Sequence, residues 1–129
     1  MENIKKSTAP VKLKLLVTIV NRSKAEFFTD LIHGFEVNMQ VVLLGEGTAS
    51  DETMQLLGLT DKDKAVILSI VREDRAQNVL ETLSDKFETI RNGKGVAWTI
   101  PLDSTIGAAV YRFMSNSLKG DNKWNSPTK

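Results

Sequence analysis

The sequence predicts an α+β fold whose elements follow in the order strand, helix, strand, strand, helix, strand. Apolar side chains recur at every second residue in four short segments and at helical spacing in two others. The changes between the two periods coincide with glycine, proline or a helix-capping pattern. The chain has 129 residues, 41% of them hydrophobic, which is enough for one domain with its own core.

The first half of the chain predicts a strand, a helix and a second strand. Residues 12 to 20, KLKLLVTIV, follow Pro10 and alternate in polarity, as a strand does. One face of this strand carries the apolar residues Leu13, Leu15, Val17 and Ile19. Ser23 and Glu26 then match the S-x-x-E capping box at the start of a helix that Gly34 ends. Alternation returns in residues 37 to 44, VNMQVVLL, which we expect to be the second strand.

The second half predicts a buried strand, a long helix and a last strand. Residues 64 to 71, KAVILSIV, are apolar on both faces apart from Ser69, which is typical of a central strand. Residues 73 to 91 form a helix with one apolar stripe, and NGKG ends it. The stripe consists of Ala76, Val79, Leu80, Leu83, Phe87 and Ile90. Residues 96 to 101, VAWTIP, form the last strand, in which Pro101 marks its end or a sheet edge.

This order of elements is the ferredoxin-like arrangement, with an antiparallel sheet and both helices on one of its faces. The segment between the two middle strands is too long for a tight hairpin, and we expect a short helix within it at 51 to 57. Residues 106 to 116, IGAAVYRFMSN, fit either an edge strand or a helical turn. We expect a single domain over residues 10 to 118, with mobile tails at 1 to 9 and 119 to 129.

Strand alternation also predicts an apolar patch on the sheet face away from the helices. The side chains expected there are Leu16, Val20, Val42, Leu44, Ile67 and Val71. Because a monomer would expose a large apolar surface in this way, we expect subunits to pack their bare sheet faces together in a homotrimer. The alternative is that the C-terminal segment covers the patch within one subunit.

Charge and composition exclude several classes of partner. Seventeen Lys and Arg residues against sixteen Asp and Glu give a net charge of +1, so we expect no binding to nucleic acid or to an anionic membrane surface. The absence of cysteine excludes disulfides, thiolate catalysis and cysteine-bound metal. The N-terminal MENIKKSTAP lacks the apolar run of a signal peptide, and no stretch is long and apolar enough for membrane insertion. A cytoplasmic protein is expected.

The titratable residues do not form a catalytic or metal-binding set. His33, the single histidine, falls near the end of the first helix, without a nucleophile or a metal ligand at a recognisable spacing. The carboxylates of SDE (50 to 52) and DKD (61 to 63) lack the order of a calcium loop, and they fit a helix start and a solvated turn. We therefore expect neither enzymatic activity nor a metal site.

Two glycine-bearing loops are the candidates for a ligand site. The first loop follows the second strand and contains Gly45, Gly47 and Thr48, and the second precedes the last strand and contains Gly93, Lys94 and Gly95. If the two loops meet across a subunit boundary, their glycines let backbone N–H groups approach an anion, and Lys94 adds positive charge. Alternatively, the first loop only turns the chain and the second only ends a helix.

Three segments in this order resemble the nitrogen-regulatory PII-like proteins, particularly a branch with a short central loop. They are VTIVNRSKAEFF, LLGEGTASDETMQLLGLTDKDKAVILSIV and GKGVAWTIPLDSTIG, within residues 12 to 107. The resemblance implies a ferredoxin-like trimer with a barrel-like core formed by its three sheets. It also implies clefts between subunits that bind ATP or ADP, and regulation of a transporter, enzyme or transcription factor. ATP, ADP and AMP are the candidate effectors.

The resemblance also assigns roles to single residues. Gly45 and Gly47 match the glycines at the base of the family's signalling loop, and Gly93 and Gly95 match those of its phosphate-facing loop. This chain departs from the typical pattern at Val96, which replaces a phosphate-binding lysine, and at Gly107 and Ala109, which replace two arginines. Lys94 is a partial substitute for the lysine. Because Tyr111 is the single tyrosine of the chain, the central loop lacks the modifiable tyrosine of the typical switch.

These departures imply weak ATP binding or a preference for a smaller or less charged effector. Two other functions fit the same fold. One is an acylphosphatase-like hydrolase, for which NRSK (21 to 24) supplies an arginine after the first strand but no glycine-rich cradle. The other is a structural trimer or a module that binds a ligand other than a nucleotide, such as a metal-tolerance protein.

Overall fold

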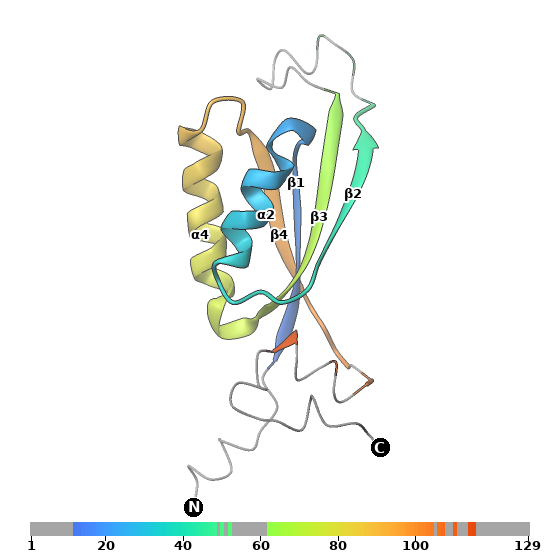
Figure 1. Cartoon of the computed structure of the whole chain (residues 1–129), viewed down its shortest axis with the longest axis vertical. Coiled ribbons are helices and arrows are strands. Elements are labelled where there is room, and N and C mark those ends of the chain that lie inside the picture. Colours follow the sequence, from blue (N-terminus) through green and yellow to red (C-terminus); the bar gives the residue numbers. More distant parts are fainter. Residues whose placement is uncertain are drawn as a thin grey trace, which may run out of the picture.

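The alternating and helical segments fold into four strands and two α-helices in the expected order (Figure 1). The computed structural model describes residues 12–48, 50, 52, 62–104, 106–107, 110 and 114–115. The elements are β1 (Leu13–Asn21), the 3-10 turn η1 (Arg22–Lys24), α2 (Ala25–His33), β2 (Gln40–Glu46), β3 (Asp63–Arg72), α4 (Glu73–Thr89) and β4 (Gly95–Pro101). Apart from Glu52, the expected helix at 51 to 57 lies outside the described residues, as do the expected tails at 1 to 9 and 119 to 129.

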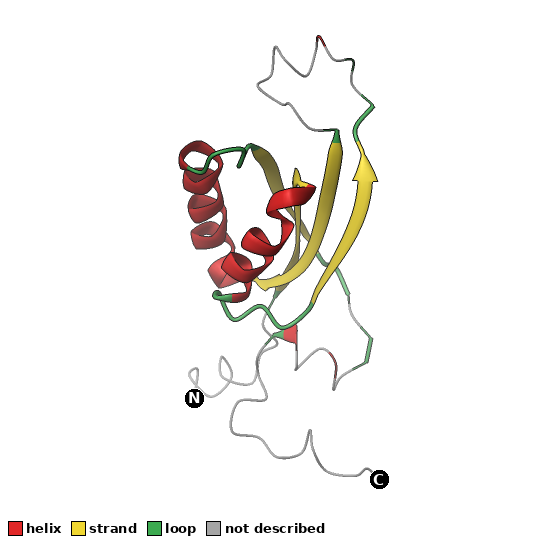
Figure 2. Cartoon of the chain, turned by 45° about the horizontal axis from the view of Figure 1, so that its top comes forward, coloured by secondary structure: helices red, strands yellow, loops and turns green. Residues whose placement is uncertain are grey.

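The four strands form one antiparallel sheet in the order β2-β3-β1-β4. β3 is central, as its two-sided apolarity predicts, and β4 is an edge strand that ends at Pro101, as the proline predicts. Both helices lie on the same face of the sheet (Figure 2). The α+β class and the two-layer arrangement predicted from the sequence are therefore confirmed.

The assignment of the two sheet faces from the sequence is wrong. Leu16, Val20, Ile67 and Val71, expected on the bare face, are each at most 1% exposed and form the core with Phe28, Ile32, Val79 and Leu83 of the helices. Val42 and Leu44 lie on this helix-bearing side too, since Val42 pairs with Ile67 and Leu44 with Ala65, but on edge strand β2 they remain exposed.

Side-chain size explains which face the helices cover. By strand register, the helix-bearing side contains a set of small residues: Thr18, Ala65, Ser69, Gly95 and Ala97. Small side chains let a helix approach the sheet closely and fill the space beneath it with the large apolar residues of its own stripe. The bulkier set on the other side would hold the helices away from the backbone.

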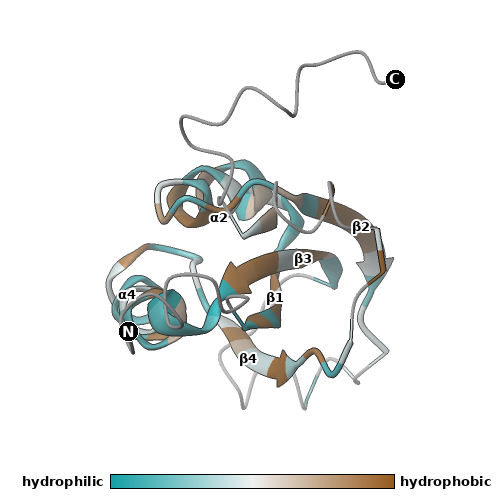
Figure 3. Ribbon diagram, turned by 90° about the horizontal axis from the view of Figure 1, so that it is seen from below, coloured by the Kyte–Doolittle hydropathy of each residue, from teal (hydrophilic) through white to brown (hydrophobic). Residues whose placement is uncertain are grey.

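The sheet side away from the helices is apolar across all four strands, and we call it the bare face. It comprises Leu15, Val17, Ile19, Val41, Leu43, Val66, Leu68, Ile70, Val96, Trp98 and Ile100. Three successive rows of the register are involved, and in the middle row Val41, Leu68, Val17 and Trp98 lie side by side. Its edge residues are exposed, Val41 at 49% and Trp98 at 41%. Among the described elements, no helix or strand covers this side (Figure 3).

The ends of the helices differ in part from the sequence prediction. Ser23 lies in the turn η1, and Lys24 rather than Ser23 is the N-cap of α2, without a side-chain capping hydrogen bond. The predicted capping box is therefore wrong. Gly34 is the C-cap of α2, as expected, and Glu73 and Asp74 occupy the first turn of α4, where the helix dipole favours carboxylates.

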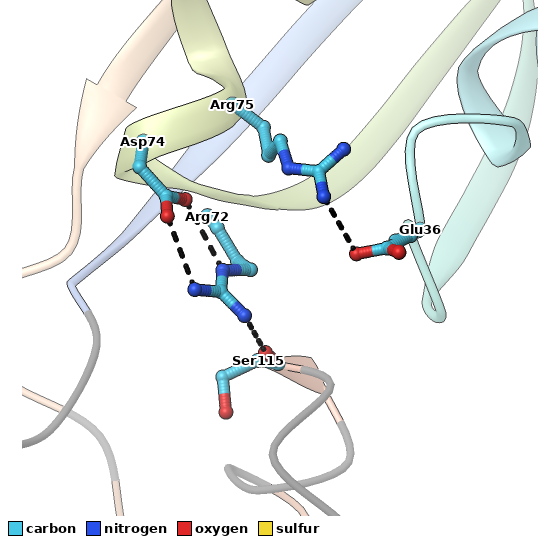
Figure 4. Close-up of polar contacts among 5 residues, drawn as sticks. All are labelled: Glu36, Arg72, Asp74, Arg75 and Ser115. Atoms are coloured by element: carbon cyan, nitrogen blue, oxygen red, sulfur yellow. Dashed lines mark hydrogen bonds and ion pairs between the residues drawn. The ribbon is translucent and has the colours of Figure 1, made fainter. Parts of the chain in front are cut away.

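Arg72 and Arg75 form hydrogen bonds to other segments at the end of the sheet where α4 begins (Figure 4). Arg72 donates to both carboxylate oxygens of Asp74, at 3.1 Å each, and to the carbonyl oxygen of Ser115 at 3.3 Å. Arg75 donates to Glu36 in the turn after α2 at 3.1 Å. Ser115 is fully buried, and Met114 has a helical backbone. Apart from Ile106, Gly107, Val110, Met114 and Ser115, the edge strand or helical turn expected at 106 to 116 lies outside the described residues.

Candidate functional site

The two predicted glycine loops lie at the same end of the sheet but on its opposite edges. Gly45, near the end of β2, is opposite Lys64 of β3, which pairs in turn with Asn21 of β1. Gly95 begins β4 and is opposite Val20 of β1. Two strands, β3 and β1, thus separate the loops, and one subunit does not bring them together. A site that uses both loops needs a second copy of the chain.

The glycines of the two loops differ in how much space surrounds them. A Cβ atom at Gly45 would have no heavy atom within 4 Å, and one at Gly47 would have the Lys62 carbonyl oxygen at 3.6 Å. A Cβ atom at Gly95 would lie 2.7 Å from the Ile19 carbonyl oxygen, and one at Gly93 would lie 2.8 Å from the Ile90 Cβ. Packing within the subunit therefore accounts for Gly93 and Gly95, whereas Gly45 and Gly47 leave space that a ligand can use.

The polar residues predicted for the site are exposed. Thr48 is exposed next to Gly47, whose N–H donates to the Lys62 carbonyl oxygen at 2.7 Å. The Lys94 Nζ lies 3.9 Å from the Glu88 carboxylate, with 51% and 74% of the two side chains exposed. Such an ion pair is weak, but it places a negative charge beside the cation that the sequence assigned to the anion site.

Three residues at the ends of β1 and β3 connect the two loops, and the site prediction missed them. Asn21, which is 4% exposed, accepts from the Lys64 Nζ at 2.7 Å and donates through Nδ2 to the Asn92 carbonyl oxygen at 3.0 Å. Arg22 donates to the Gly45 carbonyl oxygen at 3.1 Å. Through the adjacent residues Asn21 and Arg22, these hydrogen bonds link the end of β2 to the turn before β4. The cationic side chains of Arg22 and Lys64 take part in them.

The sequence contained only a weak signal for this cluster. The dipeptide Asn21–Arg22 ends a predicted strand, a position where polar side chains gather at the edge of a sheet. Its contact with Gly45 joins strands that are not neighbours in the sheet, because β3 lies between β1 and β2. The strand order decides this proximity, and local sequence does not encode it.

Outside the glycine loops, we looked for a metal-binding group and for a cavity among the described residues. No group of three or more His, Cys, Asp or Glu side chains that could hold a metal occurs among the described residues. A cavity of about 290 Å³ lies at the opposite end of the sheet, lined in part by Lys12, Lys14, Glu73 and Asp103. It is remote from the glycine loops, and its lining mixes both signs of charge.

Comparison with known proteins places the fold. No protein-family model and no curated protein sequence matches this chain. Several solved structures do match it. CPII from Thiomonas intermedia K12, bound to ADP, AMP and acetate, has a TM-score of 0.60 at 22% identity, over 78% of this chain and 94% of CPII. Another structure of CPII, a nitrogen regulatory PII-like protein, bound to ADP, AMP and bicarbonate, has a TM-score of 0.53 at 23% identity, over 70% of this chain and 92% of that one.

The chain has the fold of the PII-like proteins. The resemblance found in the sequence is thus confirmed at the level of the fold. A functionally unknown protein from Pediococcus pentosaceus ATCC 25745 is also similar, with a TM-score of 0.56 at 17% identity, over 75% of this chain and 98% of that one. Within its described part, the chain has no helix that is long and apolar enough to cross a membrane.

Proposed function

We propose that this chain is a PII-like regulatory protein without enzymatic activity. It assembles as a homotrimer in the cytoplasm, binds an adenine nucleotide or a similar small anion between subunits, and regulates a partner protein. The observation that carries the proposal is the placement of the two glycine loops, at one end of the sheet and on opposite edges.

Assembly follows from the bare face. Eleven side chains over four strands form an apolar surface of a kind that soluble monomers rarely expose. Three copies that turn this face inward form a closed ring, in which the β2 edge of one copy meets the β4 edge of the next. Because both loops are at the same end, each boundary then brings Gly45 and Gly47 of one subunit towards Lys94 of its neighbour.

The chemistry of these loops suits an anion. Gly45 and Gly47 leave room for a ligand close to the backbone, and Arg22, Lys64 and Lys94 lie at the same end of the sheet. Backbone N–H groups and cations together bind phosphate and carboxylate oxygens. CPII, which shares the fold, was solved with ADP and AMP, and this supports an adenine nucleotide as the effector.

The hydrolase alternative is less well supported. An acylphosphatase-like site requires an arginine and an asparagine directed at one substrate. The asparagine beside Arg22 is Asn21, which is buried and whose amide is already bonded to Lys64 and to the backbone of Asn92. Arg22 itself contacts the Gly45 carbonyl oxygen rather than a glycine-rich cradle.

Titration calorimetry with ADP, AMP and ATP tests the proposal. We expect saturable binding of ADP or AMP with one site per chain and weaker binding of ATP. Gly47→Val, which fills open space beside the Lys62 carbonyl oxygen, should reduce the affinity without changing the assembly. Heat signals indistinguishable from buffer dilution for all three nucleotides would contradict nucleotide regulation.

A further inference from the structure

We infer that the Arg22 guanidinium is the cation that binds the oxyanion of the ligand at the β2 wall of the cleft. This inference rests on the proposed function. It adds a ligand-binding side chain that belongs to neither glycine loop. The oxyanion belongs to a nucleotide phosphate or to a small carboxylate, since both present the same oxygen geometry to an arginine.

The position of Arg22 is fixed from two sides. Its NH2 group donates to the Gly45 carbonyl oxygen at 3.1 Å, which holds the guanidinium beside the open space at this glycine. The preceding residue, Asn21, is buried and bonded to Lys64 and to the backbone of Asn92, so the chain leaves β1 in a defined direction. An exposed arginine held in this way loses less side-chain freedom when a ligand binds.

The donors and the charge of Arg22 are available to a ligand. A guanidinium has five N–H donors, and the contact with Gly45 uses one of them. Among the described residues, no carboxylate forms an ion pair with Arg22, whereas Glu88 lies 3.9 Å from the Lys94 ammonium. The remaining donors can therefore bind an oxyanion in bidentate fashion, a geometry that lysine cannot reproduce.

The test measures four ligands against wild type, Arg22→Gln, Arg22→Lys and Lys24→Gln by titration calorimetry. The ligands are ADP, adenosine, inorganic pyrophosphate and acetate. Lys24→Gln is the matched control, because Lys24 lies in the same turn and the substitution removes the same charge. Circular dichroism melting of each variant checks that the fold is retained.

We expect Arg22→Gln to weaken ADP and pyrophosphate binding by about ten- to a hundredfold and to leave adenosine unchanged. Arg22→Lys should give an intermediate loss, and Lys24→Gln less than about a threefold change. A loss for acetate, with ADP unchanged, also supports the inference and identifies a carboxylate as the ligand.

Three outcomes would overturn it: equal affinity of wild type and Arg22→Gln for ADP, pyrophosphate and acetate; an equal loss in Lys24→Gln; or an equal loss for adenosine. The proposed function and this inference can fail separately. Binding of pyrophosphate but not ADP, lost in Arg22→Gln, refutes nucleotide regulation and keeps the Arg22 site. Tight ADP binding to wild type, with the affinities for ADP, pyrophosphate and acetate all unaffected by Arg22→Gln, does the reverse. No binding of any ligand to wild type refutes both.

Discussion

At the scale of single residues, the glycines show how similar sequence features arise from different physical causes. GEG and GKG each place two glycines around a charged residue. Around Gly45 there is open space, whereas a side chain at Gly95 would collide with the Ile19 backbone, the Phe87 ring and Val20. Glycine in the second motif is thus needed for folding, whatever the ligand.

We predict that Gly95→Ala lowers the free energy of unfolding by about 1 to 3 kcal/mol, because the added methyl group forces the β1 backbone or the Phe87 ring to move. Gly45→Ala, in the adjacent row of strand pairs, should change it by less than about 0.5 kcal/mol. Urea unfolding followed by circular dichroism, at one protein concentration, measures both values. If both variants lost the same free energy of unfolding, the close contacts around Gly95 would not be the reason that glycine is needed there.

At the scale of elements, a charged contact at the start of α4 also includes a hydrogen bond to Ser115. Arg72, the N-cap of this helix, binds Asp74 in the first turn and the Ser115 carbonyl oxygen. The hydrogen bonds from Arg72 have the largest effect and lower the pKa of the Asp74 carboxyl. Burial has the next largest effect and opposes them, and the charges of Arg72 and Arg75 lower the pKa further. The ionised carboxylate is therefore favoured in the folded state.

A lowered pKa in the folded state means that Asp74 adds stability above its ordinary pKa of 3.8 and loses this contribution as the pH falls through the folded value. We predict that Asp74→Asn is less stable than wild type at pH 7 and that the difference disappears under strongly acidic conditions. Because 60% of this side chain is exposed, the effect should be about 1 kcal/mol or less.

A double-mutant cycle with Arg72→Gln, by urea unfolding at neutral and acidic pH, isolates the coupling between the two side chains. The coupling energy should be favourable at pH 7 and vanish in acid. A coupling that persists at the acidic end would mean that the charge of Asp74 does not contribute to it.

At the scale of the whole molecule, the bare face is the proposed interface between subunits. Adjacent residues of β2 provide a matched test, since Val41 lies on the bare face and Val42 on the helix-bearing side, with similar exposures of 49% and 42%. In the proposed trimer, Val41 is buried between subunits and Val42 is not part of that inward surface.

We predict that Val41→Lys dissociates the assembly, because it places a charge without a partner in an apolar interface. Val42→Lys should leave the assembly intact. Sedimentation equilibrium at micromolar concentration measures both, and wild type should have about three times the 14.3 kDa mass of one chain. A monomeric wild type, or equal dissociation of the two variants, would exclude the bare face as the subunit interface.

The elements, their order and the α+β class could be predicted from local patterns in the chain. The reason is that apolar periodicity and element-ending residues are local features. The apolar stripe of α4 is contained within 17 residues, and Gly34 and Pro101 lie at the ends of α2 and β4. Apolarity on both faces likewise placed β3 in the interior of the sheet. The glycines and Lys94 made the two loops site candidates, and the resemblance to PII-like proteins then assigned roles to their glycines.

Two features could not be predicted from local patterns: which sheet face the helices cover, and what surrounds each glycine loop. In β1, Leu15, Val17 and Ile19 alternate with Leu16, Thr18 and Val20, so either set could face a core. The choice depends on small side chains contributed by β3 and β4, which are distant in the sequence. The contact between Arg22 and Gly45 arises in the same way, because the strand order brings together the ends of β1 and β2, two strands that are not neighbours.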